Sequence, residues 1–203
     1  MSLVLYGHPF SSYTQKVLIA LYENGTPFEF RCIGPDTPQH SAEWLKRWPL
    51  RKFPLLVDGE RNIVETSIII EYLQLAHPGP VRLLPADPMA ALDVRFLDRF
   101  FDLHVMEAMQ VAVDSALKRV PVKSEEGLVL ARERLERAYA WLEGQLAGRT
   151  WAAATSIRVR RAWAYGLRRK AACSSPGSST SSTNSAWPRS SRGSSLRVTE
   201  APT

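Results

Sequence analysis

The first 76 residues alternate between short apolar runs and amphipathic stretches, as in a small α/β unit. An apolar run at residues 3–6 is followed by a helical pattern over residues 12–24, which Gly25 ends. Residues 28–33 then alternate apolar and polar positions, as a strand does. A strand, a helix and a second strand in this order predict a right-handed βαβ crossover with parallel strands.

The second half of this unit predicts a hairpin between two helices. A short helix is expected near residues 42–48, and apolar runs at 55–57 and 62–64 flank the turn sequence Asp-Gly-Glu-Arg. A further helical pattern starts at Thr66 and stops before the prolines and glycine of residues 77–80. We therefore expect a mixed four-stranded sheet with helices packed against it.

The rest of the chain predicts helices only. Asp87-Pro88 is a strong helix start, and an unbroken helical pattern continues to about residue 118. Ser124 then begins a second amphipathic helix that runs to Gly148. These patterns predict four parts, in this order: a first domain at 1–76, a linker at 77–87, a helical domain at 88–151 that is incomplete, and an atypical, poorly ordered tail at 152–203.

Charge separates the tail from the rest of the chain. The 203 residues carry a formal charge of +6, but residues 1–150 hold 17 Lys and Arg against 19 Asp and Glu, a net charge of −2. The folded part therefore gives no reason to expect a nucleic-acid partner. No apolar run approaches the roughly 18 residues that span a bilayer, and the N-terminus lacks a secretory pattern. We expect a cytoplasmic protein with no membrane partner.

Ser11 is the candidate catalytic residue, because it lies where the first predicted strand meets the first predicted helix. A helix N-terminus stabilises an anion, and a thiolate qualifies. Lowering a thiol pKa of about 8.5 by two units requires about 2.7 kcal/mol. One hydroxyl hydrogen bond to a charged sulfur contributes about 1.5 to 3 kcal/mol. Serine at such a junction is also a common helix N-cap, so both interpretations remain open.

Several motifs in this order resemble the serine-type cytosolic glutathione S-transferases, in particular theta- or zeta-like bacterial members. They are Tyr6, Ser11-Ser12-Tyr13-Thr14, Phe53-Pro54 and Glu65-Thr66, followed by the helical region, and the likeness covers about residues 1–150. The resemblance implies an α/β thioredoxin-like N-terminal domain with a mixed four-stranded sheet, followed by an all-α C-terminal domain. It also implies a homodimer, and detoxification as the role.

The resemblance assigns a part of glutathione to each motif. Ser11 would hydrogen-bond the sulfur, and a cis-proline at Pro54 would let the backbone of Phe53 pair with the cysteinyl moiety. The remaining contacts would come from Glu65-Thr66 at the γ-glutamyl group and from Lys52, with His40 or Gln39, at the glycyl carboxylate. In the slot of a redox Cys-x-x-Cys motif the chain has Ser11 and Thr14, which excludes dithiol chemistry.

The implied function is a glutathione transferase that conjugates the glutathione thiolate to small electrophiles, with glutathione as co-substrate. Cys32 and Cys173 lack metal-ligand spacing, so no metal is expected. Phe10, Phe100 and His104 are the candidate walls of the electrophile pocket.

Several alternatives stay open. The protein could be a non-catalytic glutathione-binding or protein-interaction module, or a glutathione-dependent isomerase or peroxidase. Within the site, Tyr6 could donate to the sulfur in place of Ser11, and Pro54 could be an ordinary trans proline. The basic tail could also be an arm that binds nucleic acid or an anionic membrane.

The tail departs from the family pattern. Residues 174–195 contain eleven serines, and residues 151–203 contain nine Arg and Lys against the single acid Glu200. Such a composition cannot build a core. It is what a sequence read out of frame from a GC-rich gene looks like, and we expect a shift of the reading frame near residue 153.

Overall fold

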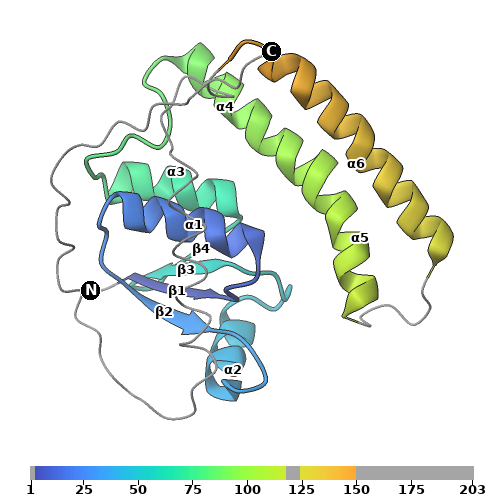
Figure 1. Cartoon of the computed structure of the whole chain (residues 1–203). Helices are drawn as coiled ribbons and strands as arrows, with labels where there is room; N and C mark the ends of the chain where they lie inside the picture. The colour runs from blue at the N-terminus through green and yellow to red at the C-terminus, as the bar shows by residue number, and fades with distance from the viewer. Residues whose placement is uncertain (1–2, 118–123, 150–203) are drawn as a thin grey trace, which may run out of the picture.

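The computed structural model describes residues 3–117 and 124–149, so the expected tail lies outside the described residues (Figure 1). Its N-terminal part contains a four-stranded sheet in the order β2-β1-β3-β4. β1 is parallel to β2, whereas β3 is antiparallel to β1 and β4. This is the mixed sheet that the sequence predicts. The strands are β1 (Leu3–Gly7), β2 (Phe28–Cys32), β3 (Leu55–Asp58) and β4 (Arg61–Val64).

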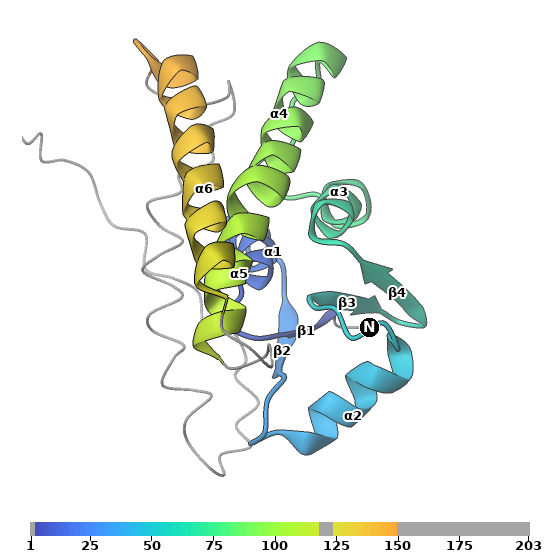
Figure 2. The same ribbon diagram turned by 90° about the vertical axis from the view of Figure 1, so that its right-hand side faces the viewer.

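Helices cover both faces of the sheet. α1 (Ser12–Glu23) and α3 (Thr66–Ala76) lie on one face and α2 (Pro38–Arg47) lies on the other, as Figures 1 and 2 both show. Successive side chains of a strand point to opposite faces of the sheet, so the core has two parts. Leu5 belongs to the part beneath α1 and α3, and Tyr6 belongs to the part beneath α2. α2 starts four residues earlier than we expected, because a proline in the first helical turn presets the helical φ.

The C-terminal part forms a separate layer of helices. It consists of α4 (Pro88–Phe100), the π-helical segment η1 (Phe101–Met106), α5 (Glu107–Ala116) and α6 (Glu125–Leu146). Asp87 and Ser124 cap α4 and α6 by accepting hydrogen bonds from backbone N–H groups at 2.8 and 2.9 Å, as predicted. The expected single helix beyond Asp87 is continuous to Ala116 but contains the π-helical turn. No described helix is both long and apolar enough to cross a membrane.

The segment between the two parts is pinned to the first domain. The N–H of Val81 donates to the side chain of Asn24 at 2.8 Å, and the N–H of Leu84 donates to Gln74 at 2.7 Å. A Cβ at Gly79 would lie 2.5 Å from the Asn24 side chain, so glycine is required at this close approach. The expected linker therefore has a fixed path at residues 79–84.

Charged side chains join the helical layer to α1 and α3. Lys16 Nζ on α1 lies 2.5 Å from Asp98 Oδ1 and 3.0 Å from Asp102 Oδ1, and Asp102 is buried. Ser67 on α3 also donates to Asp98. Arg95 forms a two-pronged ion pair with Glu71, with both N–O distances at 2.8 Å. Polar contacts therefore hold the two layers together at this boundary.

Burial opposes the ionisation of Asp98, but the hydrogen bonds from Lys16 and Ser67 hold the pKa of its carboxyl below the ordinary value. A folded-state pKa below the unfolded value of about 3.9 contributes stability at higher pH. This contribution is lost as the pH falls through the folded-state pKa.

We predict that Asp98→Asn lowers the free energy of unfolding by about 2 kcal/mol at pH 7, because it leaves Lys16 with one partner fewer at a partly buried boundary. Urea unfolding monitored by circular dichroism at pH 7 and pH 3 measures the effect. The difference from the parent should shrink as the pH falls through the folded-state pKa of Asp98, because the parent carboxyl then also loses its charge. Asp93→Asn, an exposed change on the same helix, is the control and should change stability by less than about 0.5 kcal/mol.

Candidate active site

The strand register brings four loop segments to one edge of the sheet. Tyr6 pairs with Leu55, and Leu55 pairs with Val64 on its other side. Gly7 at the end of β1 pairs with Cys32 at the end of β2. The loops that follow β1, β2 and β4 and the loop that precedes β3 therefore open at the same edge. The loops after β1, β2 and β4 lead to Ser11, to α2 and to the start of α3, respectively. The loop before β3 contains the Phe53-Pro54 pair.

Ser11 is the N-cap of α1. Its Oγ accepts a hydrogen bond from the N–H of Thr14 at 3.3 Å, and its backbone oxygen accepts one from Gln15 at 2.9 Å. A hydroxyl has two lone pairs and one hydrogen. The cap uses a lone pair and leaves the hydrogen available to a ligand. The cap and donor interpretations of Ser11 are thus compatible.

The Phe53–Pro54 peptide bond is cis, as the resemblance implies, and the trans alternative is wrong. Pro54 is buried beside the start of β3, and Phe53 lies just outside that strand. The ring of Phe53 packs edge-on against Trp44 of α2 at 5.8 Å. Packing against α2 thus fixes the segment whose backbone borders the edge.

Glu65 and Thr66 form the N-terminus of α3 at the same edge. Glu65 has φ 65° and ψ 117°, values that a non-glycine residue rarely adopts, and its exposed side chain does not cap the helix. Residues held in such conformations cluster at functional sites. Thr66 is buried, and its hydroxyl donates to the backbone oxygen of Tyr13 at 3.5 Å. This bond joins the N-termini of α3 and α1, so two partial positive charges lie at this edge.

His40 and Lys52 belong to the α2 side of the edge. His40 Nδ1 lies 3.1 Å from the backbone oxygen of Cys32 at the end of β2, and Gln39 is the exposed residue beside it on α2. Lys52 is exposed, and its backbone oxygen accepts a hydrogen bond from the Trp44 indole at 3.1 Å. Both residues therefore border the edge from elements other than α1 and α3.

Tyr6 is directed away from α1. Its side chain is 1% exposed in the core beneath α2. The hydroxyl donates to Glu43 at 2.8 Å and accepts from Arg31 at 2.7 Å. Burial raises the pKa of Tyr6, and the hydrogen bond to Glu43 raises it further, against the lowering effect of Arg31. These contacts favour Tyr6 as a core residue over the alternative of a sulfur donor.

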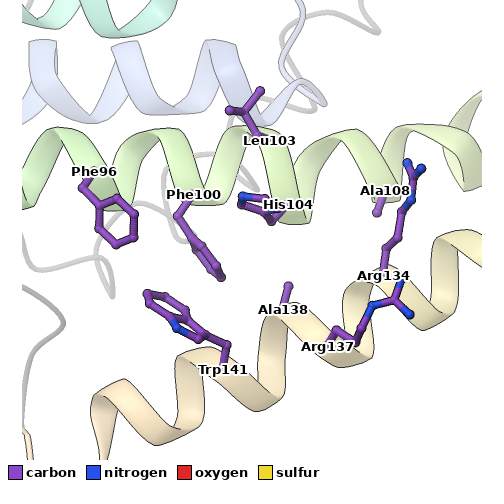
Figure 3. A pocket seen from close by; sticks show the side chains of 9 residues that line it. All are labelled: Phe96, Phe100, Leu103, His104, Ala108, Arg134, Arg137, Ala138 and Trp141. Carbon is purple, nitrogen blue, oxygen red and sulfur yellow. The ribbon is translucent and has the colours of Figure 1, made fainter.

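The three expected pocket residues do not lie together. Phe100 and His104 point from α4 and η1 toward α6, where they line a cavity of about 510 Å³ (Figure 3). In the same view α1 lies on the other side of α4. Phe10 is 69% exposed in the loop between β1 and α1, stacked on His8 at 5.4 Å. The cavity is therefore separate from the edge that carries Ser11.

The residues that join the site to the helical layer are not among those predicted from the sequence. Lys16 lies about one turn after Tyr13 on α1. Its partners Asp98 and Asp102 are four residues apart on one helical face. This spacing of two acids among apolar positions of a helix was a visible signal. The cation that they bind is more than 80 residues away in sequence, so the pairing itself was not visible.

Comparisons with known proteins agree with this geometry. The family model of the glutathione S-transferase N-terminal domain matches residues 5–81. The uncharacterized GST-like protein YibF of Escherichia coli (strain K12) is 33% identical over 143 residues, covering 70% of this chain and 69% of that protein. A probable maleylacetoacetate isomerase of Vibrio cholerae is 30% identical over 151 residues, covering 72% and 69%.

A solved structure shows the same architecture. The crystal structure of a glutathione S-transferase from Methylobacterium radiotolerans, in complex with glutathione sulfonate, has a TM-score of 0.64 at 27% identity, covering 83% of this chain and 78% of that chain. The sequence matches span 61% to 69% of the lengths of three curated relatives. The chain belongs to the glutathione S-transferase family.

Proposed function

We propose that this protein is a serine-type glutathione transferase that binds glutathione as a thiolate and conjugates it to small electrophiles. The observation that carries the proposal is the position of Ser11, which caps α1 with a lone pair and keeps its hydrogen for a ligand. The cis-proline segment and the N-terminus of α3 meet Ser11 at the same sheet edge. In this proposal residues 1–76 bind glutathione, and residues 88–151, beyond the linker 77–87, supply part of the electrophile site.

Ser11 would act by favouring the charged form of the thiol. Its hydroxyl would donate to the sulfur, while the N-terminus of α1 adds about 0.3 to 1 kcal/mol. Together with about 1.5 to 3 kcal/mol for the hydrogen bond, this would lower the thiol pKa by about one to three units. The sulfur would then attack an electrophilic carbon with its electron pair, and the leaving group would depart with the pair of the broken bond.

The other site residues would position the tripeptide. The backbone of Phe53, freed by cis Pro54, would pair with the cysteinyl moiety. The exposed carboxylate of Glu65 would bind the ammonium group of the γ-glutamyl residue, and Thr66 with its helix N-terminus would bind the adjacent carboxylate. Lys52, with His40 or Gln39, would face the glycyl carboxylate. We include a cytoplasmic homodimer in the proposal, because the family resemblance implies one.

A second candidate function is glutathione-dependent isomerisation. The Vibrio cholerae relative, named a probable maleylacetoacetate isomerase, favours it, at 30% identity over 72% of this chain. The same thiolate would add to the substrate and leave again after the bond has rotated. Both functions therefore need Ser11, and they differ in whether glutathione remains in the product.

We predict that Ser11→Ala shifts the pH midpoint of turnover with an aryl halide upward by about one to two units and lowers kcat/KM at pH 7 by about 10- to 100-fold. Calorimetric titration with glutathione in two buffers of different ionisation enthalpy should show that the parent releases most of one proton. The variant should bind with little release at pH 7.

Ser12→Ala is the matched control, because Ser12 is the neighbouring serine in the first turn of α1 but does not cap it. It should leave both the pH midpoint and the proton release unchanged. Thermal unfolding of Ser11→Ala accounts for the loss of the cap, about 1 kcal/mol. Unchanged turnover in a folded Ser11→Ala protein would instead defeat the catalytic assignment of Ser11.

We predict that Glu65→Gln raises KM for glutathione by about 10- to 100-fold with little change in kcat, because one charged hydrogen bond contributes about 1.5 to 3 kcal/mol to binding. A glutathione analogue without the γ-glutamyl amino group provides the partner for a double-mutant cycle. Parent and variant should bind this analogue equally. Additive losses would show that Glu65 and the ammonium group do not interact.

We also propose that the tail arises from a shifted reading frame near residue 153. Its support is compositional, with nine basic residues against one acid after residue 150. Leu92 and Phe96, which we expect a later helix to cover, are 54% and 53% exposed. Re-sequencing the gene through that codon should reveal the shift. An unbroken frame, with the printed tail present in the intact mass of the expressed protein, would refute this proposal.

A further inference from the structure

Tyr13 lies in the first turn of α1, between the candidate glutathione site and the helical layer. It precedes Lys16 by three residues, so the two share a face of the helix. Lys16 binds Asp98 and Asp102, so this face is directed at α4 and η1. The backbone oxygen of Tyr13 accepts the hydroxyl of Thr66 at the start of α3. Tyr13 is therefore held beside the candidate γ-glutamyl site with its side chain toward the second layer.

The surroundings of the Tyr13 hydroxyl are those of a hydrogen-bond donor. Burial raises its pKa, and the charges of Asp102 and Glu107 raise it further, against the effect of Arg99. The charge of Glu65 raises the pKa in the same direction. Within residues 3–117 and 124–149, no hydrogen-bond partner of this hydroxyl is found. The group thus stays protonated at neutral pH, and its hydrogen is available to a ligand.

We propose that Tyr13 is a catalytic residue that donates a hydrogen bond to an oxygen atom of the electrophile. This inference rests on the proposed function, because it requires a glutathione thiolate at Ser11. Ser11 is two residues before Tyr13 at the start of the same helix. A sulfur held by Ser11 and an electrophile held toward η1 would meet beside the Tyr13 side chain. The substrate class is then an uncharged electrophile whose reaction places negative charge on oxygen, namely an epoxide or an α,β-unsaturated carbonyl.

For an epoxide, the proposed reaction is opening of the ring by the glutathione thiolate. The thiolate forms a carbon–sulfur bond, and the carbon–oxygen bond breaks with its electron pair on oxygen. That oxygen takes the proton of Tyr13, and the tyrosinate regains a proton from water. The carboxylates Asp102 and Glu107 raise the pKa of the hydroxyl and so help to keep it protonated before the step. A hydrogen bond that strengthens as charge develops raises kcat more than it lowers KM.

Tyr13→Phe removes the hydroxyl and keeps the ring. We expect kcat/KM with an uncharged aryl epoxide to fall about 100-fold, as for loss of one donor to a developing oxyanion. Turnover with 1-chloro-2,4-dinitrobenzene, in which chloride leaves without a proton, should change by less than about twofold. Proton release on glutathione binding should stay at the parent value. Tyr139→Phe, at an exposed tyrosine of α6, is the matched control and should change none of these quantities.

The outcomes separate this inference from the proposed function. A parent protein that binds glutathione without releasing a proton would overturn both. A parent that releases the proton, with a Tyr13→Phe variant of unchanged epoxide turnover, would overturn the role of Tyr13 alone. An equal loss of kcat/KM with the epoxide and the aryl halide, together with reduced proton release, would indicate that Tyr13 donates to the sulfur. That result would also overturn the inference.

Discussion

The antiparallel pairing of β3 with β1 is the constraint on which the candidate site depends. It sets Leu55 opposite Tyr6, so the segment that enters β3 lies beside the loop that leaves β1. The β3–β4 hairpin then places Val64 opposite Leu55, and α3 starts two residues later. A slip of one residue would turn Leu55 and Val57 from the core to the other face. Core packing thus fixes the register, and the register places the site.

Ser11 caps α1, and in the proposed function it would also act in the chemistry. The N-terminus of α1 needs an acceptor, and the serine oxygen provides it without using its hydrogen. Alanine would lack both groups, and aspartate would cap the helix but repel a thiolate. In the proposed function the hydroxyl and the helix N-terminus would act on the same sulfur, so the group that stabilises the helix would also prepare the site.

Local patterns in the sequence predicted most of the fold. The sheet, the hairpin and the caps at Asp87 and Ser124 depend on neighbouring residues and were confirmed. The early start of α2 was missed because the first residues of this helix are polar and show no apolar periodicity. The π-helical turn of η1 was missed because no local sequence pattern indicates it. The site residues were predicted from motif order, whereas the bonds of Lys16 to Asp98 and Asp102 depend on tertiary packing. The same packing decides that Phe100 and His104 face α6 and do not join Phe10.

The two halves of the proposed reaction depend on different parts of the molecule. The groups assigned to glutathione come from the sheet edge and the starts of α1 and α3, which are fixed by contacts within the first domain. The groups that would meet the electrophile depend on how α4 and η1 sit against α1. At that boundary Lys16 and Ser67 hold Asp98 from two different helices. Charge pairs are directional and sensitive to their surroundings, whereas the domain core is held by apolar packing. If the proposed function holds, substitutions in the helical layer would therefore change the choice of electrophile while glutathione binding is retained.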